Sequence, residues 1–379
     1  MRRDAPRRVL TRIEKSLPGA WYRDAEQYRR ELDALWMRGW LYACRSDELA
    51  ARDYRVIAVG DQSVLLTRDL AGRLRAFHNI CRHRGSELCS ETHGRFRGPT
   101  IVCPYHGWTY SLEGALLGMP HQLPGADFRR EDHPLYTAAV DTWAGFVFVN
   151  PNGDAAPPLS EALGAMPADL ASWPLGELRV GERTSTNLEC NWKVFWENFS
   201  ECFHCPGVHP ELSRLVPAYR KGLLDEADDP DAAPPAGPRA GLASGALTWT
   251  LDGQTRLPQL PGLSQQQRDA GQTFGVMPPG FFVVAHVDYA RAVRVLPRGP
   301  EQTQLQVEWL FDPAVLARPD FDLEHATALG RLVVEQDARI CERNQRGLRS
   351  RRHAHGVLVP QEYGVFAFHE WLRRGLGEA

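Results

Sequence analysis

The sequence lacks any apolar run approaching the roughly 18 residues that a membrane-spanning helix needs. The Arg-rich segment before residue 20 has no apolar stretch behind it, which argues against a signal peptide and favours a solvated tail. A net charge of only −3 gives no reason to expect a nucleic-acid partner. We therefore expect a soluble, cytoplasmic protein with no membrane and no nucleic-acid partner.

Two further features are missing. We find no internal repeat and no glycine-rich fingerprint for a nicotinamide nucleotide, so any NAD(P)H must be bound by another protein. Eight cysteines in 379 residues without a secretion signal argue against a disulfide framework. Such cysteines are buried apolar side chains, metal ligands or catalytic thiols, and their neighbours decide which.

Short strand-like runs dominate the first part of the chain. Gly-Asp and Ala-Gly turns separate three of them over residues 54–80, and the pattern continues over 100–120 and 143–150. A Pro- and Gly-rich stretch over 151–158 then marks a boundary. These patterns predict a small all-β domain over about 40–153.

The rest of the chain mixes helical and strand patterns. Apolar residues recur at near-helical spacing over 21–40. We predict a helix around 192–204, strands around 280–312, and helices around 320–347 and 361–375, which together indicate an α+β class. A further stretch, rich in Ala, Pro, Gly and Asp, is interpreted as a mobile loop: residues 224–245.

The first candidate metal centre consists of two short motifs. Cys81 and His83 form one, and Cys103 and His106 form the other. Zinc sites usually pair like residues at close range, whereas a Rieske [2Fe-2S] cluster takes two Cys on one iron and two His on the other. Either motif alone would fit a buried cysteine and a structural histidine, but the two together favour a cluster. Three nearby residues fall outside the pattern and are interpreted as structural: His78, Cys89 and His93.

The second candidate centre lies around His204 and His209. Glu197, Glu201 and His204 have the spacing of one helical face. On an unbroken helix His209 would point elsewhere, but the Pro-Gly pair at 206–207 should break the helix and let the chain turn back. We therefore expect the two imidazoles to meet.

Two imidazoles need a carboxylate to complete a 2-His-1-carboxylate triad, whose open face binds O2 and substrate. Glu197, Glu201 and a distant acid are all candidates. Asp337 lies in an apparent amphipathic helix flanked by apolar residues, where an acid needs a partner or a metal. A salt-bridged surface acid would explain Asp337 as well, so the residues alone leave this choice open.

Several segments resemble the α subunits of Rieske non-heme iron oxygenases, the ring-hydroxylating oxygenase family. The similar segments are Cys81-Arg-His-Arg-Gly, Cys103-Pro-Tyr-His-Gly-Trp-Thr-Tyr, Asn191-Trp-Lys, Glu197-Asn-Phe-x-Glu-x-x-His204-x4-His209, and Gln336-Asp337 with Asn344-Gln345-x-Gly347. The resemblance spans about residues 20–375. It implies that His204, His209 and Asp337 bind Fe(II), and that the four residues of the first centre hold a [2Fe-2S] cluster.

The resemblance also implies an architecture. An all-β Rieske domain (40–153) would be inserted in a helix-grip catalytic domain with a central antiparallel sheet (1–39 and 154–379). Family members are commonly homotrimers in which the cluster of one subunit lies near the iron of the next. Electrons would come from NAD(P)H through a separate flavin and iron–sulfur reductase or a ferredoxin.

Within this family the acid three residues before the first iron histidine bridges the two centres. Here that acid is Glu201, and Asn198 is a second candidate catalytic residue. Glu at this position, with Pro360-Gln-Glu-Tyr-Gly and Phe368-His-Glu-Trp371, resembles the branch acting on glycine betaine, choline, carnitine and stachydrine. Such a substrate would suit an aromatic cage, for which the candidates are Phe203, Trp249, Phe281 and Phe282, with Tyr289 and Trp309 also available.

The expected reaction is hydroxylation or N-demethylation of a small substrate by O2. One alternative keeps the iron chemistry on another substrate, as an aromatic-ring hydroxylating dioxygenase or O-demethylase. A second alternative is a zinc-stabilised binding protein, which would be colourless. A third, an electron-transfer Rieske protein, does not explain the residues after 190.

Overall fold

The computed structural model describes residues 9–121, 125, 127–225, 228–229 and 241–378. The chain divides into two compact units. The β unit is Leu32–Gly164, and the α+β unit combines Met1–Glu31 with Ala165–Ala379. The predicted functional boundaries, after residues 39 and 153, stay predictions.

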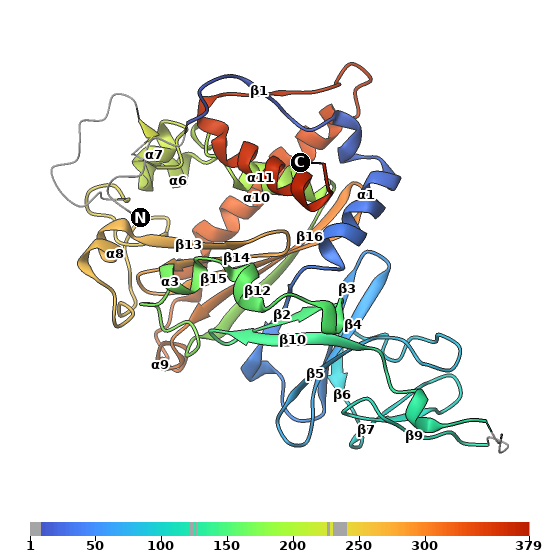
Figure 1. Cartoon of the computed structure of the whole chain (residues 1–379). Coiled ribbons are helices and arrows are strands. Elements are labelled where there is room, and N and C mark those ends of the chain that lie inside the picture. Colours follow the sequence, from blue (N-terminus) through green and yellow to red (C-terminus); the bar gives the residue numbers. More distant parts are fainter. Residues whose placement is uncertain (1–8, 122–124, 126, 226–227, 230–240, 379) are drawn as a thin grey trace. The chain divides into compact units, whose positions relative to one another are not determined.

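The β unit contains two antiparallel sheets (Figure 1). The larger has the order β2 (Leu41–Arg45), β11 (Phe146–Asn150), β10 (Thr137–Trp143), β5 (Leu74–His78), β4 (Gln62–Arg68), β3 (Asp53–Val59) and β6 (His93–Arg95). The smaller has the order β7 (Thr100–Val102), β8 (Thr109–Ser111) and β9 (Leu116–Gly118). The predicted all-β character of this region is confirmed.

The predicted turns connect these strands. Gly60 has a φ of 57°, a left-handed conformation that glycine adopts without strain, and it links β3 to β4. Asp69 opens the turn between β4 and β5, where its carboxylate accepts the backbone N–H of Arg73 at 2.8 Å. The register of β3, β4 and β5 follows from these two short turns.

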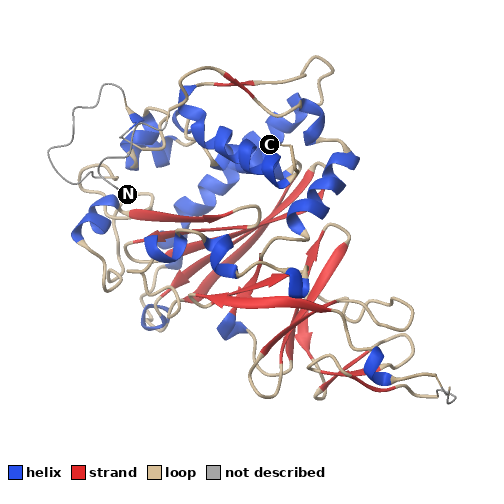
Figure 2. Cartoon of the chain, in the orientation of Figure 1, coloured by secondary structure: helices blue, strands red, loops and turns tan. Residues whose placement is uncertain are grey.

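The α+β unit is built on one five-stranded antiparallel sheet, visible as long red arrows in Figure 2. Its order is β12 (Arg179–Leu188), β16 (Gln302–Phe311), β15 (Ala290–Gly299), β14 (Phe281–His286) and β13 (Gln272–Met277). The helices that position the candidate site are α4 (Trp192–Phe199), α10 (Leu323–Leu348) and α11 (Tyr363–Gly375). The predicted α+β class with a central antiparallel sheet is confirmed.

Helices cover both faces of this sheet. Helices α4 and α10 pack on one face, and α11 packs on α4. Helix α3 (Met166–Asp169) lies against β13 on the other face, where a Cβ at Gly275 would stand 2.6 Å from the Met166 side chain. A fully buried ion pair between Lys193 and Glu31, 2.8 Å apart, ties α4 to α1 (Ala25–Glu31).

Several shorter α-helices and strands accompany these elements. They are β1 (Glu14–Lys15), α2 (Leu159–Leu163), α5 (Cys205–Val208), α6 (Pro210–Leu215), α7 (Pro217–Arg220), α8 (Gln265–Ala270), α9 (Pro313–Leu316) and β17 (Val357–Leu358). Among the described helices, none is both long and apolar enough to cross a membrane.

One expectation needs correction, and two strands were not expected. The predicted helix around 192–204 ends at Phe199, and a new helical turn, α5, begins at Cys205. Strands β12 and β13 were not anticipated, because β12 carries mostly polar side chains, and β13 has a glycine, Gly275, at a buried position and an apolar residue, Val276, at an exposed one. Most of the predicted mobile loop, 224–245, lies outside the described residues.

Candidate functional site

The four candidate ligands of the first centre lie on two loops of the β unit and sort into two pairs. Cys81 and Cys103 are buried in the same apolar cluster. The rings of His83 and His106 lie with their centroids 4.7 Å apart, and His83 is exposed to solvent. A Rieske cluster needs this division, with buried thiolates on one iron and outward imidazoles on the other.

Glycines shape both loops. Gly85 and Gly107 have φ values of 78° and 69°, in the left-handed region. Each donates its backbone N–H to the carbonyl of the cysteine four residues earlier, at 3.1 Å in both loops. The two loops therefore wrap their cysteines with the same local geometry.

Aromatic side chains support the same centre. The Tyr110 hydroxyl lies 3.2 Å from Sγ of Cys81 and accepts the backbone N–H of Arg82 at 3.1 Å. The Trp108 ring stacks on His83 at 4.8 Å with an interplanar angle of 6°. Burial raises the pKa of the Cys81 thiol, whereas the Tyr110 hydrogen bond opposes the rise and stabilises a thiolate.

The arrangement fits a two-iron cluster better than a single zinc ion. A structural zinc ion draws four ligand atoms around one point. Within the described part of the chain, only the second centre brings at least three His, Cys, Asp or Glu ligand atoms within 4.8 Å of one another. The candidate ligand atoms of the first centre do not gather around one point in this way, which suits ligation of two different irons.

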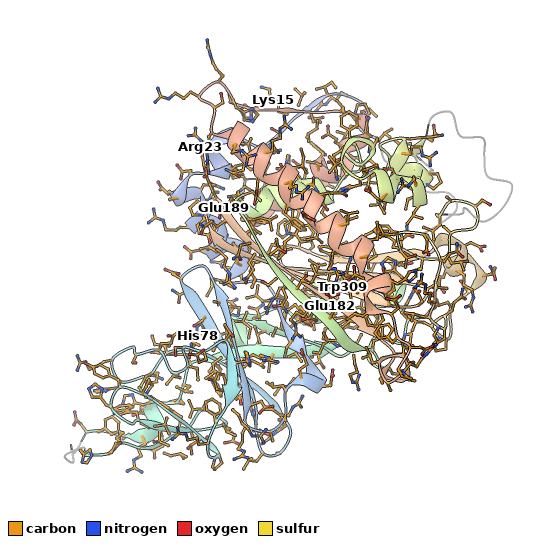
Figure 3. The ribbon with its side chains drawn as sticks, turned by 180° about the vertical axis from the view of Figure 1, so that it is seen from behind. Lys15, Arg23, His78, Glu182, Glu189 and Trp309 are labelled. Atoms are coloured by element: carbon orange, nitrogen blue, oxygen red, sulfur yellow. The ribbon has the colours of Figure 1, made fainter. Side chains whose placement is uncertain are left out.

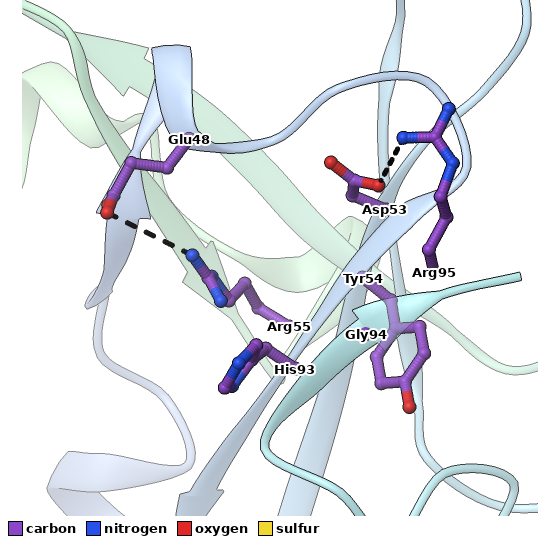
Figure 4. Close-up of a pocket in the computed structure, with 7 residues that line it drawn as sticks. All are labelled: Glu48, Asp53, Tyr54, Arg55, His93, Gly94 and Arg95. Atoms are coloured by element: carbon purple, nitrogen blue, oxygen red, sulfur yellow. Dashed lines mark hydrogen bonds and ion pairs between the residues drawn. The ribbon is translucent and has the colours of Figure 1, made fainter.

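The three residues interpreted as structural have protein partners. His78 Nε2 lies 3.0 Å from the Pro151 carbonyl oxygen. The Asn79 side chain donates to the carbonyl of Cys89 and accepts its backbone N–H. Burial raises the pKa of the Cys89 thiol to about 12, so the thiol stays protonated. Nδ1 of His93 lies 3.2 Å from the Thr92 hydroxyl. His93 and Arg55 also line a surface hollow of about 320 Å³, shown in Figure 4. No predicted site residue lines that hollow.

In the α+β unit, the second centre brings three predicted ligands together. Nε2 of His204 lies 3.1 Å from Nε2 of His209. Oδ1 of Asp337 lies 2.9 Å from Nε2 of His209 and 3.6 Å from Nε2 of His204. The structure therefore favours Asp337 over the two nearer acids as the third ligand.

Each of the two imidazoles has a hydrogen-bond acceptor at its Nδ1 atom, the ring nitrogen that is not among the converging ligand atoms. Oε1 of Glu201 lies 2.6 Å from Nδ1 of His204, and Oε1 of Gln336 lies 2.8 Å from Nδ1 of His209. Acceptors at Nδ1 fix the tautomer that leaves the Nε2 lone pair free for a metal. The Asn198 amide donates to Oδ1 of Asp337 at 2.7 Å and orients that carboxylate.

The electrostatics show three groups arranged for a cation. Burial alone would lower the pKa of His204, but hydrogen bonds to Asp337, Cys205 and Glu201 raise it to about 12. Burial would likewise raise the pKa of Asp337, but hydrogen bonds to His204 and His209 lower it to about 2. Protons thus balance the carboxylates at the position where a metal ion would sit.

The local chain path differs from the predicted one. Helix α4 ends at Phe199, so Glu201 and His204 belong to the turn that follows and not to one helical face. Pro206 occupies the first turn of α5, where its missing N–H costs nothing, and the pair at 206–207 lies inside that helix. His209 caps the end of α5 and returns to His204 from there.

Glu197 belongs to a different network. Its Oε1 accepts the Tyr22 hydroxyl at 2.5 Å and lies 2.8 Å from Nε2 of the fully buried His369. A cavity of about 430 Å³ opens beside these groups, and Glu197, Glu201 and His204 are among its lining residues. Glu197 therefore lines the cavity beside the candidate iron centre. Its carboxylate contacts Tyr22 and His369 instead of His204 and His209.

Comparison with known proteins decides the family. Residues 39–136 match the Rieske [2Fe-2S] domain, and residues 175–378 match the ring hydroxylating alpha subunit (catalytic domain). The second match covers more than half of the chain. The chain belongs to the family of ring-hydroxylating Rieske oxygenase α subunits.

Individual relatives resemble this family member along nearly its whole length. The glycine betaine monooxygenase oxygenase subunit of Chromohalobacter salexigens is 32% identical, covering 94% of this chain and 85% of the relative. The chloroplastic choline monooxygenase of Spinacia oleracea is 26% identical, covering 95% of this chain and 78% of the relative. A crystal structure of the quaternary ammonium Rieske monooxygenase CntA with L-carnitine has the same fold, with a TM-score of 0.72, 21% identity and 96% of each chain covered.

Family membership confirms several predictions. The chain is the oxygenase component of a Rieske non-heme iron enzyme, an oxidoreductase that uses O2. Its cofactors are a [2Fe-2S] cluster and a mononuclear iron, with electrons supplied by a separate reductase. The zinc-stabilised binding protein and the simple electron-transfer protein are excluded, because the chain matches the family's catalytic domain.

The candidate cage residues of this Rieske oxygenase do not form one group. Phe281 and Phe282 are neighbours on β14, so their side chains point to opposite faces of the sheet. Phe282 packs on Phe199 with ring centroids 4.1 Å apart, whereas Phe203 is 51% exposed. Trp249 is buried in an apolar cluster with Cys205 and Val333, and its ring lies 6.2 Å from that of Phe274. A single cage of these four rings is not present.

Sequence reasoning missed two supporting residues. Gln336 was noted only as part of a similar segment, yet it orients His209 and also donates to Glu211 at 3.0 Å. Tyr110, which contacts the Cys81 thiol, was given no role. Both residues lie within the similar segments: Gln336 directly precedes Asp337, and Tyr110 ends the segment that begins at Cys103. A polar side chain close in sequence to a predicted ligand was therefore the available signal.

Proposed function

We propose that this chain is the oxygenase component of a monooxygenase that removes a methyl group from a small quaternary ammonium compound. The observation that carries the proposal is the 32% identity, over nearly the whole chain, to a protein named for glycine betaine oxygenation. Choline monooxygenases among the relatives support the same substrate class. Glu201, the acid typical of this branch, stands directly behind the first candidate iron ligand.

We assign the mononuclear iron to His204, His209 and Asp337. When bound there, the iron would supply the activation of O2. The convergence of the two Nε2 atoms and Oδ1 within 3.6 Å supports the assignment. The chain contributes orientation: Gln336 holds one imidazole and Glu201 the other, so both present a lone pair to the same point.

Glu201 and Asn198 are positioning residues in this proposal. Glu201 acts through His204, and Asn198 acts through Asp337. Neither needs to touch the substrate. Glu201 also lines the 430 Å³ cavity, so its carboxylate is within reach of a group that enters from outside this unit.

We assign the [2Fe-2S] cluster to Cys81, His83, Cys103 and His106, within a Rieske domain over 40–153; residues 1–39 and 154–379 form the catalytic domain. Exposure of His83 beside His106 supports delivery of electrons through the imidazole side of the cluster. A flavin and iron–sulfur reductase or a ferredoxin would supply them from NAD(P)H.

We further propose a homotrimer in which a second copy of the chain places its cluster histidines at the cavity beside Glu201. The cavity's polar lining suits an imidazole N–H, because Glu201 and Asn344 offer acceptors there. A cytoplasmic location completes the proposal, and it is supported by the eight cysteines, all free and buried.

The proposed reaction balances without further reactants. A trimethylammonium compound, O2, two electrons and two protons give a hydroxymethyl ammonium and water. The hydroxymethyl ammonium then loses formaldehyde and a proton, which leaves the tertiary amine. The residues near the iron must therefore admit an N-methyl group and exclude excess water, which the apolar cluster around Cys202, Cys205 and Trp249 favours.

The test is substrate turnover by the purified holoenzyme with a generic ferredoxin reductase and NADH. Glycine betaine, choline and carnitine are compared with benzoate-type aromatic acids by O2 uptake and formaldehyde release. We expect formaldehyde, coupled to O2 uptake, from at least one quaternary ammonium compound. Coupled turnover of an aromatic acid alone would overturn the substrate assignment and leave the iron chemistry intact.

A further inference from the structure

Three polar side chains without hydrogen-bond partners meet on one face of the central sheet. Both ring nitrogens of His286, Nε of Arg291 and Nε1 of Trp309 are buried and have no partner among the described residues. Arg291 pairs with Val284 on β14 and with Trp309 on β16, and His286 stands two residues beyond Val284. Strand alternation therefore turns all three polar side chains to the same side.

That side is the one that α10 covers. Glu182 stands beside Trp309 in the sheet (Figure 3). Glu182 also forms an ion pair with Arg331 of α10. A Cβ at Gly330 would lie 3.0 Å from Nη1 of Arg291 and 3.1 Å from Nε1 of Trp309. Glycine at this position lets the α10 backbone approach both donors.

Arg291 is the unusual member of this group, because it carries a charge. Its side chain is 7% exposed, and no described carboxylate forms an ion pair with it. The guanidinium instead lies 5.8 Å from the centre of the Trp249 ring. A cation–π contact offsets only part of the cost of burying a guanidinium, so an anion would stabilise it strongly.

Nearby groups do not supply that anion. Burial lowers the pKa of Arg291, and the charges of Tyr289, Asp337 and Tyr219 oppose the change. The two tyrosines are neutral at ordinary pH, because burial raises the pKa of both phenols. Asp337 is engaged with two imidazoles and Asn198, and a bound iron would take up its charge.

The position of Arg291 relates it to the iron centre. Gly330 and Asp337 are seven residues apart on α10, so they share a face and are separated by about 10 Å along the helix axis. Trp249, which Arg291 contacts, belongs to an apolar cluster that includes Cys205 and Val333. The guanidinium therefore stands two helical turns from the metal ligand, at the end of an apolar and aromatic stretch.

We propose that Arg291 binds the carboxylate of a zwitterionic substrate and so selects betaine-type compounds over choline-type ones. The inference rests on the proposed function and narrows its substrate class. A short zwitterion would place its carboxylate at Arg291 and its methylammonium group toward Asp337. Trp249, whose ring centroid lies 6.2 Å from that of Tyr219 and 6.2 Å from that of Phe274, provides aromatic surface between the two ends.

Neighbouring donors complete the carboxylate site. Burial, and then the charge of Arg291, hold the pKa of His286 well below its usual value, so the ring is neutral and has one N–H to donate. Trp309 offers a second N–H. A cation without a carboxylate, such as choline, would leave all three donors unpaired and would be repelled by Arg291.

The test measures dissociation constants of the holoenzyme by calorimetry for glycine betaine, choline and tert-butylacetate, which keeps the carboxylate but has no ammonium group. We expect Arg291→Gln to weaken the binding of glycine betaine and tert-butylacetate by roughly 10- to 100-fold. The affinity for choline should stay unchanged or increase. Arg291→Lys keeps the charge without the planar fork and should give intermediate affinity. Arg298→Gln, on the same strand but bonded to Gln304, is the matched control and should change none of the three.

The outcomes separate the two proposals. If Arg291→Gln weakened the binding of all three ligands equally, or lost its iron, the role of Arg291 would be structural and the inference would be overturned. Wild-type turnover of choline with no binding of either carboxylate would also overturn it while the proposed function stands. Binding of tert-butylacetate that depends on Arg291, without turnover of any quaternary ammonium compound, would support the carboxylate site and reject the proposed function. If Arg291→Gln does not fold, the Arg291→Lys affinities decide, and affinities equal to wild type would reject the inference.

Discussion

The carboxylate of Glu201 holds His204 at two points. Its Oε1 lies 2.6 Å from Nδ1 of the ring, and its Oε2 accepts the backbone N–H of the same residue at 3.1 Å. Gln336 contacts Nδ1 of His209 in the equivalent way, but it brings no charge. The two candidate ligands are therefore oriented alike, but only His204 has a negatively charged group at its Nδ1 atom.

This asymmetry predicts the behaviour of Glu201→Gln. The amide keeps the shape of the side chain and an oxygen acceptor for Nδ1, so the cluster and the mononuclear iron should both be retained. Loss of the charge should reduce turnover by about 10- to 100-fold, the usual effect of changing a residue behind a metal ligand. Metal analysis, the visible spectrum and formaldehyde release measure the three quantities.

The matched control is Glu335→Gln. Glu335 lies on α10 and pairs with exposed Arg339, away from the ligand atoms. Its variant should retain wild-type turnover. If Glu201→Gln turned over as fast as this control, Glu201 would have no part in linking or orienting the centres.

Asp337→Ala should remove the mononuclear iron and leave the cluster. The change deletes the only carboxylate among three converging ligands and leaves two imidazoles, which bind Fe(II) weakly. Iron and acid-labile sulfide analyses, with the cluster absorbance, check this. Glu197→Gln is the control, because Glu197 contacts Tyr22 and His369 instead of the ligands, and it should keep the iron. If Glu197→Gln lost the mononuclear iron and Asp337→Ala kept it, Glu197 would be the third ligand.

Cys81→Ala should bleach the cluster, because it removes one of two thiolates on the same iron. Cys89→Ala is a closely matched comparison: Cys89 is buried in the same apolar cluster as Cys81, but its thiol is held protonated. That variant should keep the visible absorbance of the wild type. Equal bleaching of the two variants would mean that the loss reflects folding of the β unit and not ligation.

The local parts of the site were predictable from the sequence, and the tertiary parts were not. Cys81 and His83 reach one centre because they are two residues apart on one loop. Asp337 meets His209 only because α10 packs against α4 and α5, and nothing near Asp337 in the sequence encodes that packing. The residues alone therefore left the third ligand open, and family resemblance was needed to choose it.

Two errors have simple physical causes. The helix over 192–204 was predicted too long, because Ser200 and Glu201 are compatible with a helix. In the structure the Ser200 hydroxyl donates to the Trp196 carbonyl at 2.6 Å, and the Glu201 carboxylate accepts the backbone N–H of His204. Both side chains bind local backbone groups in this way, and the helix ends there. The proposed cage grouped Phe281 with Phe282, although adjacent residues of a strand face opposite ways.

Metal binding by the second centre should release protons. Without a metal, hydrogen bonds that outweigh burial hold the pKa of His204 at about 12, so at pH 7 the ring is an imidazolium and must lose a proton to ligate iron. Asp337, with a pKa of about 2, is already ionised and adds none. Fe(II) affinity should therefore fall about tenfold per pH unit, for each proton released, as the pH decreases below 7.

Anaerobic calorimetry of Fe(II) binding in two buffers of different ionisation enthalpy measures the protons released. The Glu201→Gln variant provides the comparison, because Glu201, after Asp337 and Cys205, is one of the groups that raise the pKa of His204. In the variant His204 should lose its proton at a lower pH than in the wild type, so the rise of Fe(II) affinity with pH should level off at a lower pH. Identical heats in the two buffers for the wild type would mean that His204 is already neutral before the metal arrives, and the imidazolium–carboxylate arrangement would then be wrong.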